Sequence, residues 1–353
     1  MQNDMIVADL FAGVGGMSEG FKMAGGFEIA FAVEFDKGIA YAYQMNHQGT
    51  DVLAIDICSI DVSELHKKHP HIDVIIGGPP CQGFSQKGKR LSLDDPRNYL
   101  FQQYVRFVEE FRPKYFVLEN VPNILTASRG YFREEIIKAF NNLGYDVKCG
   151  VLKASDFGIP QDRHRAIFLG QIGKVEIELP SPNGIRTTIK DAIYDLPFIA
   201  SGEGEEISEY DKKPISKYQK LMRGNNKTLY NHVATKHSAV ALRRLAMIPK
   251  GAGKEVLPSE ERTKSIYSGT WSRMIEDDIS VTITTRYDTP SSGRFTHPIL
   301  DRCITTREAA RIQSFPDSFR FYGNKTSQMK QVGNAVPPLL AKAIAEQIKN
   351  NIL

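Results

Sequence analysis

The sequence predicts an α/β fold, in which a Rossmann-like, mostly parallel sheet is joined to a second, smaller domain. Short apolar runs near the N-terminus end in glycines or acids, as buried parallel strands do. The first run is followed by a glycine-rich turn that opens a helix, which is typical of nucleotide-binding sheets. From about residue 180 to residue 301 the chain is richer in Pro, Gly, Ser and Thr and has few long helical periods. With 353 residues, the chain is long enough for one large domain and a smaller one.

The composition is that of an ordinary soluble protein, with 41% hydrophobic and 24% charged residues. A net charge of +4 permits a polyanionic partner without requiring one. The four cysteines form no Cys-x-x-Cys pair, so we expect neither a disulfide framework nor a metal site. No signal peptide is evident and no apolar run approaches about 18 residues, so we expect a cytoplasmic protein that does not enter a membrane.

The first predicted strand, residues 5–11, is followed by Gly13, Gly15 and Gly16 and by a helix that starts near residue 17. Glycines at this place let the backbone approach a ligand at the helix N-terminus. The turn departs from Gly-x-Gly-x-x-Gly because Ser18 takes the third glycine position, which counts against NAD and FAD.

The next two predicted strands, residues 28–33 and 51–55, end in Glu34 and Asp56. A carboxylate about 18 residues after the glycines suits the ribose hydroxyls, and Asp56 suits an adenine amino group. Either acid alone could be a solvated cap. A glycine turn and two acids at three successive strand ends favour an adenosine without phosphates, and S-adenosylmethionine is the ligand that fits.

A fourth apolar run, residues 72–76, stops at the sequence GGPPCQ of residues 77–82. Proline fixes the backbone and glycine permits unusual angles, so Cys81 lies on a stiff turn at the carboxyl edge of the sheet. We expect Cys81 to be a nucleophile, with a buried structural cysteine as the alternative.

Residues 111–118 predict another strand, which ends in Glu119 at the same edge as Cys81. A carboxylate there can stabilise a proton on a ring nitrogen of a bound base, although a helix cap or an ion pair is also compatible. In the extended segment 161–165, Gln161, Arg163 and Arg165 share one face and offer planar donors. A charged edge strand is the alternative.

Together these segments resemble the C5-cytosine-specific DNA methyltransferase family over nearly the whole chain. The resemblance is carried by motifs in the family's order: DLFAG-x-GG at 9–16, PPCQ at 79–82, ENV at 119–121, Q-x-R-x-R at 161–165, the segment from Arg302 to Pro316, and QVGNAVPP at 331–338. It implies methyl transfer from S-adenosylmethionine to C5 of a cytosine flipped out of a specific DNA duplex. In that reaction Cys81 adds to C6, Glu119 acts at N3, and Arg165 and Arg163 hold the O2 edge.

The resemblance also implies a set of cofactor-binding residues: Asp9, Phe11, Gly13, Gly15, Gly16, Glu34, Asp56, Ile57, Pro79, Leu100, Asn334 and Val336. For Leu100, plain core packing in a helix is the alternative.

By the same resemblance, residues 1–180 completed by 322–353 form the catalytic domain, and residues 181–321 form the target-recognition domain. A helix is expected at 239–246, a strand at 280–287 and a final helix from 338. The basic, glycine-containing run 83–90 is expected to close over nucleic acid. We expect a monomer on double-stranded DNA, associated with the nucleoid. Both an orphan enzyme and one with a cognate restriction endonuclease for the same site are compatible with the sequence.

The closest rival is a tRNA cytosine-5 methyltransferase with the same cysteine chemistry. The tRNA branch of the family carries Cys-Phe-Thr in the later region, whereas Phe295 and Thr296 here follow Arg294, which favours DNA. A non-catalytic DNA-binding protein and an NAD oxidoreductase are more distant alternatives.

Overall fold

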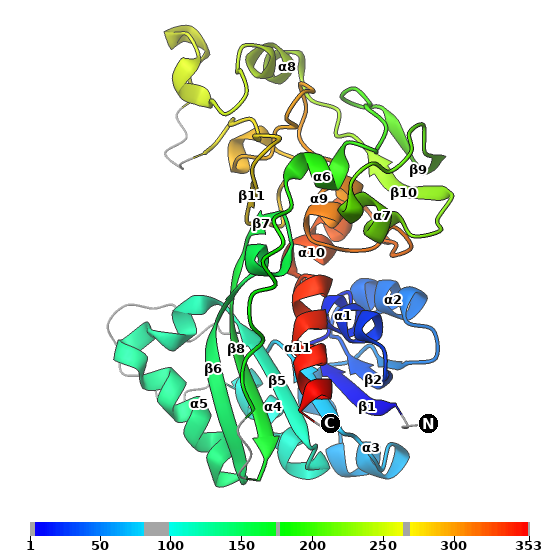
Figure 1. The fold of residues 1–353 in the computed structure, drawn as a ribbon, viewed down its shortest axis with the longest axis vertical. Helices are drawn as coiled ribbons and strands as arrows, with labels where there is room; N and C mark the ends of the chain where they lie inside the picture. Colours follow the sequence, from blue (N-terminus) through cyan, green and yellow to red (C-terminus); the bar gives the residue numbers. More distant parts are fainter. Residues whose placement is uncertain (1–3, 81–98, 174–176, 264–268, 352–353) are drawn as a thin grey trace. The chain divides into compact units, whose positions relative to one another are not determined.

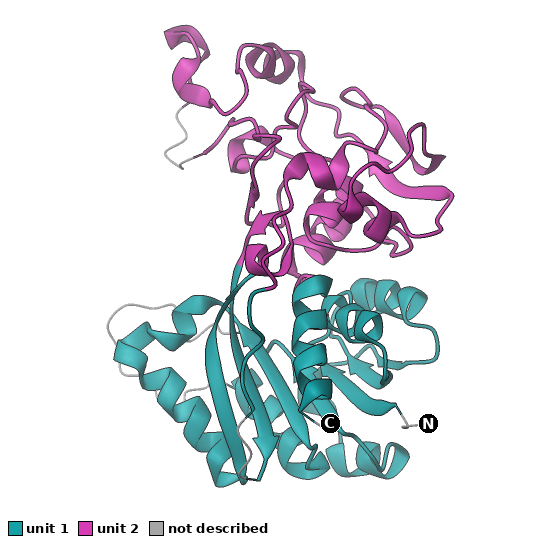
Figure 2. Ribbon diagram, in the orientation of Figure 1, with its two compact units in different colours: residues 1–153, 164–182, 338–353 teal, residues 154–163, 183–337 magenta. Residues whose placement is uncertain are grey.

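A computed structural model describes residues 4–80, 99–173, 177–263 and 269–351. Cys81 and the basic run 83–90 lie outside these described residues. Two compact units divide the chain (Figure 2): residues 1–153, 164–182 and 338–353 form unit 1, and residues 154–163 and 183–337 form unit 2. Residues 154–163 and 322–337, which the sequence assigned to the catalytic domain, therefore belong to unit 2.

Unit 1 contains a seven-stranded sheet with the order β3-β2-β1-β4-β5-β8-β6. All neighbouring strands pair in parallel except β8, which runs antiparallel to both β5 and β6. The strands are β1 Met5–Leu10, β2 Phe27–Val33, β3 Asp51–Leu53, β4 Val74–Gly77, β5 Tyr115–Asn120, β6 Tyr145–Lys153 and β8 His164–Ile172. This topology confirms the predicted Rossmann-like α/β sheet.

Helices cover the sheet (Figure 1): α1 Gly16–Ala24, α2 Lys37–Asn46, α3 Val62–Lys68, α4 Tyr99–Phe111, α5 Tyr131–Asn142 and α11 Pro338–Asn350. The last helix, α11, packs beside α1 although more than 300 residues separate them in sequence. Gly20 permits this approach, because a Cβ there would lie 2.5 Å from the Cβ of Ala341.

Unit 2 is built from short elements: β7 Gln161–Asp162, α6 Ile189–Ile193, β9 Gly204–Glu209, α7 Lys217–Arg223, β10 Thr228–Val233, α8 Ala239–Ala246, β11 Ser280–Val281, α9 Thr306–Ile312 and α10 Lys325–Asn334. The predicted helix 239–246 is confirmed as α8. The predicted strand 280–287 is wrong beyond Val281, because the amide of Ile283 bonds to the side chain of Gln161 instead of a strand partner.

The predicted strand 111–118 is also wrong at its start. Phe111 is the last residue of α4, and Arg112 has a φ of 49°, which is incompatible with a strand. The strand β5 therefore begins at Tyr115 and includes Glu119 and Asn120.

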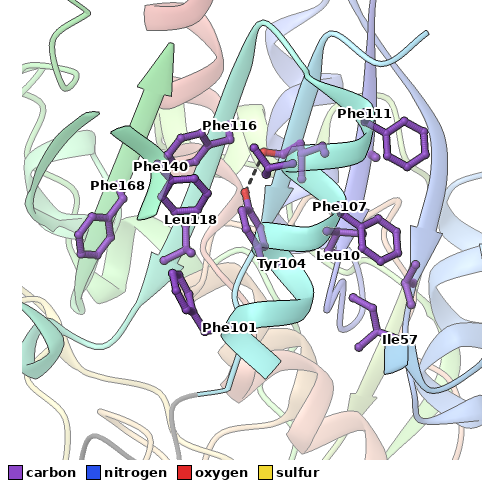
Figure 3. Close-up of a cluster of buried hydrophobic side chains, with 14 of the residues drawn as sticks. Leu10, Ile57, Phe101, Tyr104, Phe107, Phe111, Phe116, Leu118, Phe140 and Phe168 are labelled. Carbon is purple, nitrogen blue, oxygen red and sulfur yellow. Dashed lines mark hydrogen bonds between the residues drawn. The ribbon is translucent and has the colours of Figure 1, made fainter. Parts of the chain in front are cut away.

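Aromatic side chains fill the core between α4, α5 and the sheet (Figure 3). Phe116 and Phe140 stack with ring centroids 3.9 Å apart. The hydroxyl of Tyr104 on α4 shares its proton between the carbonyls of Ile75 on β4 and Val117 on β5, at 3.0 and 2.9 Å. Tyr104 thus fixes α4 against the two central strands that carry the predicted catalytic edge.

We expect Tyr104→Phe to lower the free energy of unfolding by about 1–2 kcal/mol, because a buried hydrogen bond to these strands is lost. Tyr115→Phe is the matched control, since the Tyr115 hydroxyl is also buried but has no hydrogen-bond partner among the described residues. Urea denaturation of both variants compares them, and an equal loss of stability in the two would contradict the role of the Tyr104 hydroxyl.

Candidate active site

The carboxyl ends of three neighbouring strands form the candidate site. The ends of β1, β4 and β5 are in register, with Leu10 paired to Gly77 and Gly77 paired to Leu118. Strand order turns at β1 and β4, since β2 and β3 lie on one side and β5 on the other. Ligands of open α/β sheets bind at such a switch point. The glycine turn follows β1 and the Pro-Pro-Cys sequence follows β4, while Glu119 is the second-last residue of β5.

The glycine turn has three residues with left-handed backbone angles: Phe11 (φ 57°), Gly13 (φ 56°) and Gly15 (φ 92°). A Cβ at Gly13 would meet nothing within 4 Å, so the turn leaves open space there. A Cβ at Gly15 would lie 2.8 Å from the ring of Tyr43, which makes a side chain at that position unacceptable. Gly16 is the first residue of α1, so the turn presents the helix N-terminus.

Glu34 lies beside this turn. Its carboxylate accepts hydrogen bonds from the amides of Gly13 at 2.9 Å and Asp36 at 2.8 Å. Burial raises the pKa of Glu34, and the two amides oppose this effect. Each carboxylate oxygen of Glu34 thus accepts one hydrogen bond from a backbone amide, and the remaining lone pairs suit a pair of ribose hydroxyls.

Asp56 and Ile57 follow β3, next to Glu34, whose amide donates to the carbonyl of Leu53 at 3.1 Å. Asp56 is exposed, and the backbone amide of Cys58 lowers its pKa, so it offers an ionised acceptor. Ile57 is buried in the core. Sequence reasoning missed Phe35, an aromatic residue that is 73% exposed although it directly follows Glu34. An aromatic residue adjacent to the acid predicted to bind ribose was the available signal.

Asp9, near the end of β1, is buried and accepts a hydrogen bond from Ser18 at 2.6 Å. Ser18 therefore has its own role at the position where a dinucleotide fold has glycine, since it ties α1 to β1. Burial raises the pKa of Asp9 to about 7, against the lowering effect of the Ser18 hydroxyl.

Glu119 is held at the end of β5 by Arg165, whose Nε lies 2.5 Å from Oε1 of Glu119. The side chains are only 15% and 14% exposed, so water screens this ion pair weakly. The pair exists because β8 is antiparallel to β5, with Glu119 paired to Ile167, so the beginning of β8 lies at the end of β5. The structure therefore brings together Glu119 and Arg165, and the ion pair is one of the alternatives that the sequence left open for Glu119.

Gly78 and Pro79 lie against Glu119 and its neighbour. A Cβ at Gly78 would lie 2.6 Å from Oε2 of Glu119, so the carboxylate occupies the space that a side chain would need. Asn120 donates to the carbonyl of Pro79 at 3.0 Å and is buried. The segment that leads into Cys81 is thereby anchored to β5.

Arg163 and Gln161 have different surroundings from Arg165. The guanidinium of Arg163 is buried in unit 2 and donates to the carbonyls of Ile283 at 3.1 Å and Gly333 at 2.9 Å. Gln161 is buried as well and accepts from the amide of Ile283 at 2.9 Å. These contacts explain why residues 161–163 belong to unit 2.

Three further predicted cofactor residues have the following places. Leu100, on α4, is partly buried and packs against the aromatic core. Asn334 is the exposed last residue of α10, and Val336, two residues later, is buried; both belong to unit 2.

The motif between Arg302 and Pro316 supplies the framework of unit 2. Arg302 forms a bidentate pair with Glu308, at 2.8 Å for each bond, and both are buried. Burial by itself would raise the pKa of Glu308, but the Arg302 guanidinium outweighs it and holds this pKa well below its usual range. Arg311 is similarly paired with Asp317 at 2.5 and 2.6 Å. Buried charges of this kind are stable only when fully paired, so they fix the local geometry.

The described residues of the glycine turn and strand ends fit S-adenosylmethionine. Gly13 leaves space, Glu34 presents oriented lone pairs, and Phe35 is an exposed ring. The Oδ1 atom of Asp9 is buried and has no hydrogen-bond partner within the described ranges. In the described part of the chain, no cluster of His, Cys, Asp or Glu could hold a metal ion. Among the described helices, none has the length and apolarity to cross a membrane.

Comparison with known proteins agrees with this geometry. Residues 5–350 match the family of C-5 cytosine-specific DNA methylases. The type II methyltransferase M.DdeI of Desulfomicrobium norvegicum is 40% identical over 98% of this chain and 88% of its own length. The type II methyltransferase M1.HphI of Haemophilus parahaemolyticus is 40% identical over 96% of this chain and 85% of its own.

Solved structures are similar over the whole chain. A prophage-encoded E. coli protein, described as a DNA modification methyltransferase, superposes with a TM-score of 0.82 at 29% identity and covers 99% of both chains. S. pombe Dnmt2, at 18% identity and a TM-score of 0.64, covers 98% of this chain and 99% of its own and shares the fold. The rival tRNA prediction is the less supported one. The chain belongs to the C-5 cytosine-specific DNA methylase family and transfers the methyl group of S-adenosylmethionine to C5 of cytosine in DNA.

Proposed function

We propose that this DNA methyltransferase works through a covalent Cys81 adduct, with Glu119 and Arg165 as the groups that activate a flipped cytosine. The observation that carries the proposal is the ion pair between Arg165 and Glu119, held against Gly78 and Pro79 at the end of β5. Cys81 lies outside the described residues, and its role comes from the PPCQ motif.

The chemistry follows from the weakness of cytosine C5 as a nucleophile. The Cys81 thiolate forms a bond to C6, and the electron pair of the C5–C6 double bond moves into the ring toward N3, where Glu119 stabilises the added proton. Arg165 donates to the O2 edge, where negative charge develops, and keeps Glu119 in place. Bound S-adenosylmethionine supplies an electrophilic methyl group. Loss of the C5 proton to a base then expels the Cys81 thiolate and restores the double bond.

Arg163, predicted to share the O2 contact, is assigned a positioning role. Its guanidinium donates to two carbonyls of unit 2, which supports a function in joining residues 161–163 to residues 283 and 333. Arg165 alone is then the arginine of the reacting edge.

The cofactor residues divide by the part of S-adenosylmethionine that each would hold. Glu34 binds the ribose, Asp56 and the Ile57 backbone bind the adenine edge, and Phe35 covers the adenine face. The remaining members of the set in unit 1 would line the site: Asp9, Phe11, Gly13, Gly15, Gly16, Pro79 and Leu100. Asn334 and Val336, which belong to unit 2, stay predictions of the family resemblance.

Unit 2 is proposed to read the DNA sequence, since its paired internal charges give short elements and loops a rigid base. Two curated relatives are named type II methyltransferases, which supports a role in a restriction–modification system with a cognate endonuclease. We infer a monomer on DNA. Bisulfite sequencing of DNA from cells that express the chain tests the activity, and the absence of any protected cytosine would contradict it.

We expect Gly78→Ala to reduce the rate of methyl transfer by about 10- to 100-fold, because the new Cβ would displace the Glu119 carboxylate. The clash is with the end of a flexible side chain, so thermal stability and cofactor affinity should stay close to wild type. Single-turnover kinetics and a thermal melt measure both, and wild-type kinetics would show that the position of Glu119 is unimportant.

Cys81→Ser should abolish methylation and retain measurable DNA binding, because the hydroxyl is a far weaker nucleophile than the thiolate. Cys149→Ser on β6 is the matched control and should stay active. DNA that carries 5-fluorocytosine at the target should become covalently trapped on the wild-type protein, since fluorine cannot leave as the C5 proton does. Denaturing gels read the adduct, and its absence would refute the nucleophile.

Glu34→Ala should weaken the binding of S-adenosylmethionine by about 10- to 100-fold, as expected for lost hydrogen bonds to a charged group. Glu28→Ala, an exposed acid on the same strand β2, is the control. Isothermal titration calorimetry gives both affinities, and equal values would argue against the ribose contact.

A further inference from the structure

A buried hydrogen-bond relay lies behind the glycine turn. The hydroxyl of Tyr43 on α2 donates to Oγ of Ser18 at 2.7 Å, and Ser18 donates to Oδ2 of Asp9 at 2.6 Å. The three residues are at most 1% exposed. The other carboxylate oxygen of Asp9, Oδ1, is buried and has no hydrogen-bond partner among the described residues. Half of this carboxylate is therefore oriented by the relay, and the other half is a buried acceptor that no described residue pairs.

The relay also holds the turn itself. Asp9 is two residues before Phe11, where the turn starts, and Ser18 lies in the first turn of α1, directly after it. Tyr43 lies against His47, with ring centroids 4.4 Å apart and planes tilted by 40°, and both rings lie close to the position where Gly15 lacks a side chain. Helix α2 is thus part of the cofactor site, although no motif of the sequence pointed to it.

The buried carboxylate has a chemical consequence. An ionised carboxylate in an apolar site is unfavourable unless a cation or donors compensate it. Burial raises the pKa of Asp9 to about 7, so in the free protein Asp9 is protonated in about half of the molecules at neutral pH. S-adenosylmethionine carries a sulfonium cation, whose approach would favour the ionised form.

We propose that Ser18 and Tyr43 are positioning residues that hold Asp9 toward the cationic methyl donor, and that Asp9 releases its proton when the donor binds. This inference rests on the proposed cofactor site. It makes the affinity for the cofactor depend on pH through one carboxyl group, and it assigns a function to two residues outside the family motif.

Other ionisable groups surround Asp9 and must be separated from it. The elements packed around Asp9 contribute the following groups: Glu19 and Lys22 of α1, Glu34 after β2, Tyr43 and His47 of α2, and Tyr104 of α4. Lys342 and Glu346 of α11 pair with each other. The β4 residue paired with Asp9 is apolar Ile76. Burial lowers the pKa of His47 to about 3, so His47 stays neutral between pH 6 and 8.

The direction of the effect follows from linkage. A group with a pKa near 7 in the free protein and a lower pKa in the complex must lose its proton on binding, so affinity rises with pH and levels off above 7. The dissociation constant for S-adenosylmethionine should be about tenfold larger at pH 6 than at pH 8. At pH 7 about half a proton should be released for each molecule bound.

Isothermal titration calorimetry with S-adenosylmethionine, in buffers of different ionisation enthalpy from pH 6 to pH 8, measures affinity and proton release together. Asp9→Asn should remove the contribution of Asp9 to proton release and to the pH dependence of the affinity. What remains is the titration of the ligand's amino group, with a pKa of about 7.7–8.0, which is common to all variants. Tyr43→Phe and Ser18→Ala should keep proton release but move its midpoint to higher pH, because both hydroxyls lower the pKa of Asp9. Tyr41→Phe, an exposed tyrosine of α2, is the control and should match the wild type.

A wild-type protein that binds S-adenosylmethionine with the same pH profile as Asp9→Asn would overturn the inference and leave the proposed function intact. Failure of the wild type to bind S-adenosylmethionine at all would instead count against the proposed cofactor site. Should Asp9→Asn not fold, the Tyr43→Phe midpoint decides: an unshifted midpoint contradicts the relay.

Discussion

The antiparallel strand β8 is the constraint on which the catalytic edge depends. A purely parallel sheet would place the beginning of β8 at the opposite edge from the end of β5. Because β8 is reversed, Arg165 near its beginning meets Glu119 near the end of β5, and the two form an ion pair of 2.5 Å. Gly78, on the neighbouring strand end, supplies the space for this carboxylate. Three segments far apart in sequence thus meet at the proposed reactive position.

The Q-x-R-x-R motif shows how one short segment can serve two units. Gln161 and Arg163 use their polar groups on residues of unit 2, whereas Arg165 pairs within unit 1. Each of the two buried side chains satisfies backbone groups that would otherwise be unpaired, which is a structural use of strongly polar residues. The alternation along an extended segment separates these side chains from Asp162, which is exposed.

The acids at the three strand ends differ in their surroundings, and the differences suit the different roles proposed for them. Asp56 is exposed, and the backbone amide of Cys58 favours its charged form. Glu34 is partly buried, and two backbone amides compensate for that burial. Asp9 is buried, with one oxygen bonded to Ser18 and one oxygen that no described residue pairs. Burial therefore increases from Asp56 through Glu34 to Asp9. Asp56 is a charged acceptor at the surface, whereas burial raises the pKa of Asp9 to about 7.

The sequence by itself determined the sheet, the glycine turn and the acids at the strand ends, because hydrophobic runs and punctuating residues are local signals. It also placed Glu119 at the edge that carries Cys81, but it did not predict the ion pair of Glu119 with Arg165. It could not separate Arg163 from Arg165, since strand alternation gives both the same face. The start of β5, the short β11, the exposed Phe35 and the role of Tyr43 were decided by tertiary structure. Each depends on which distant group comes within hydrogen-bond or packing distance, and the local spacing of residues does not determine this.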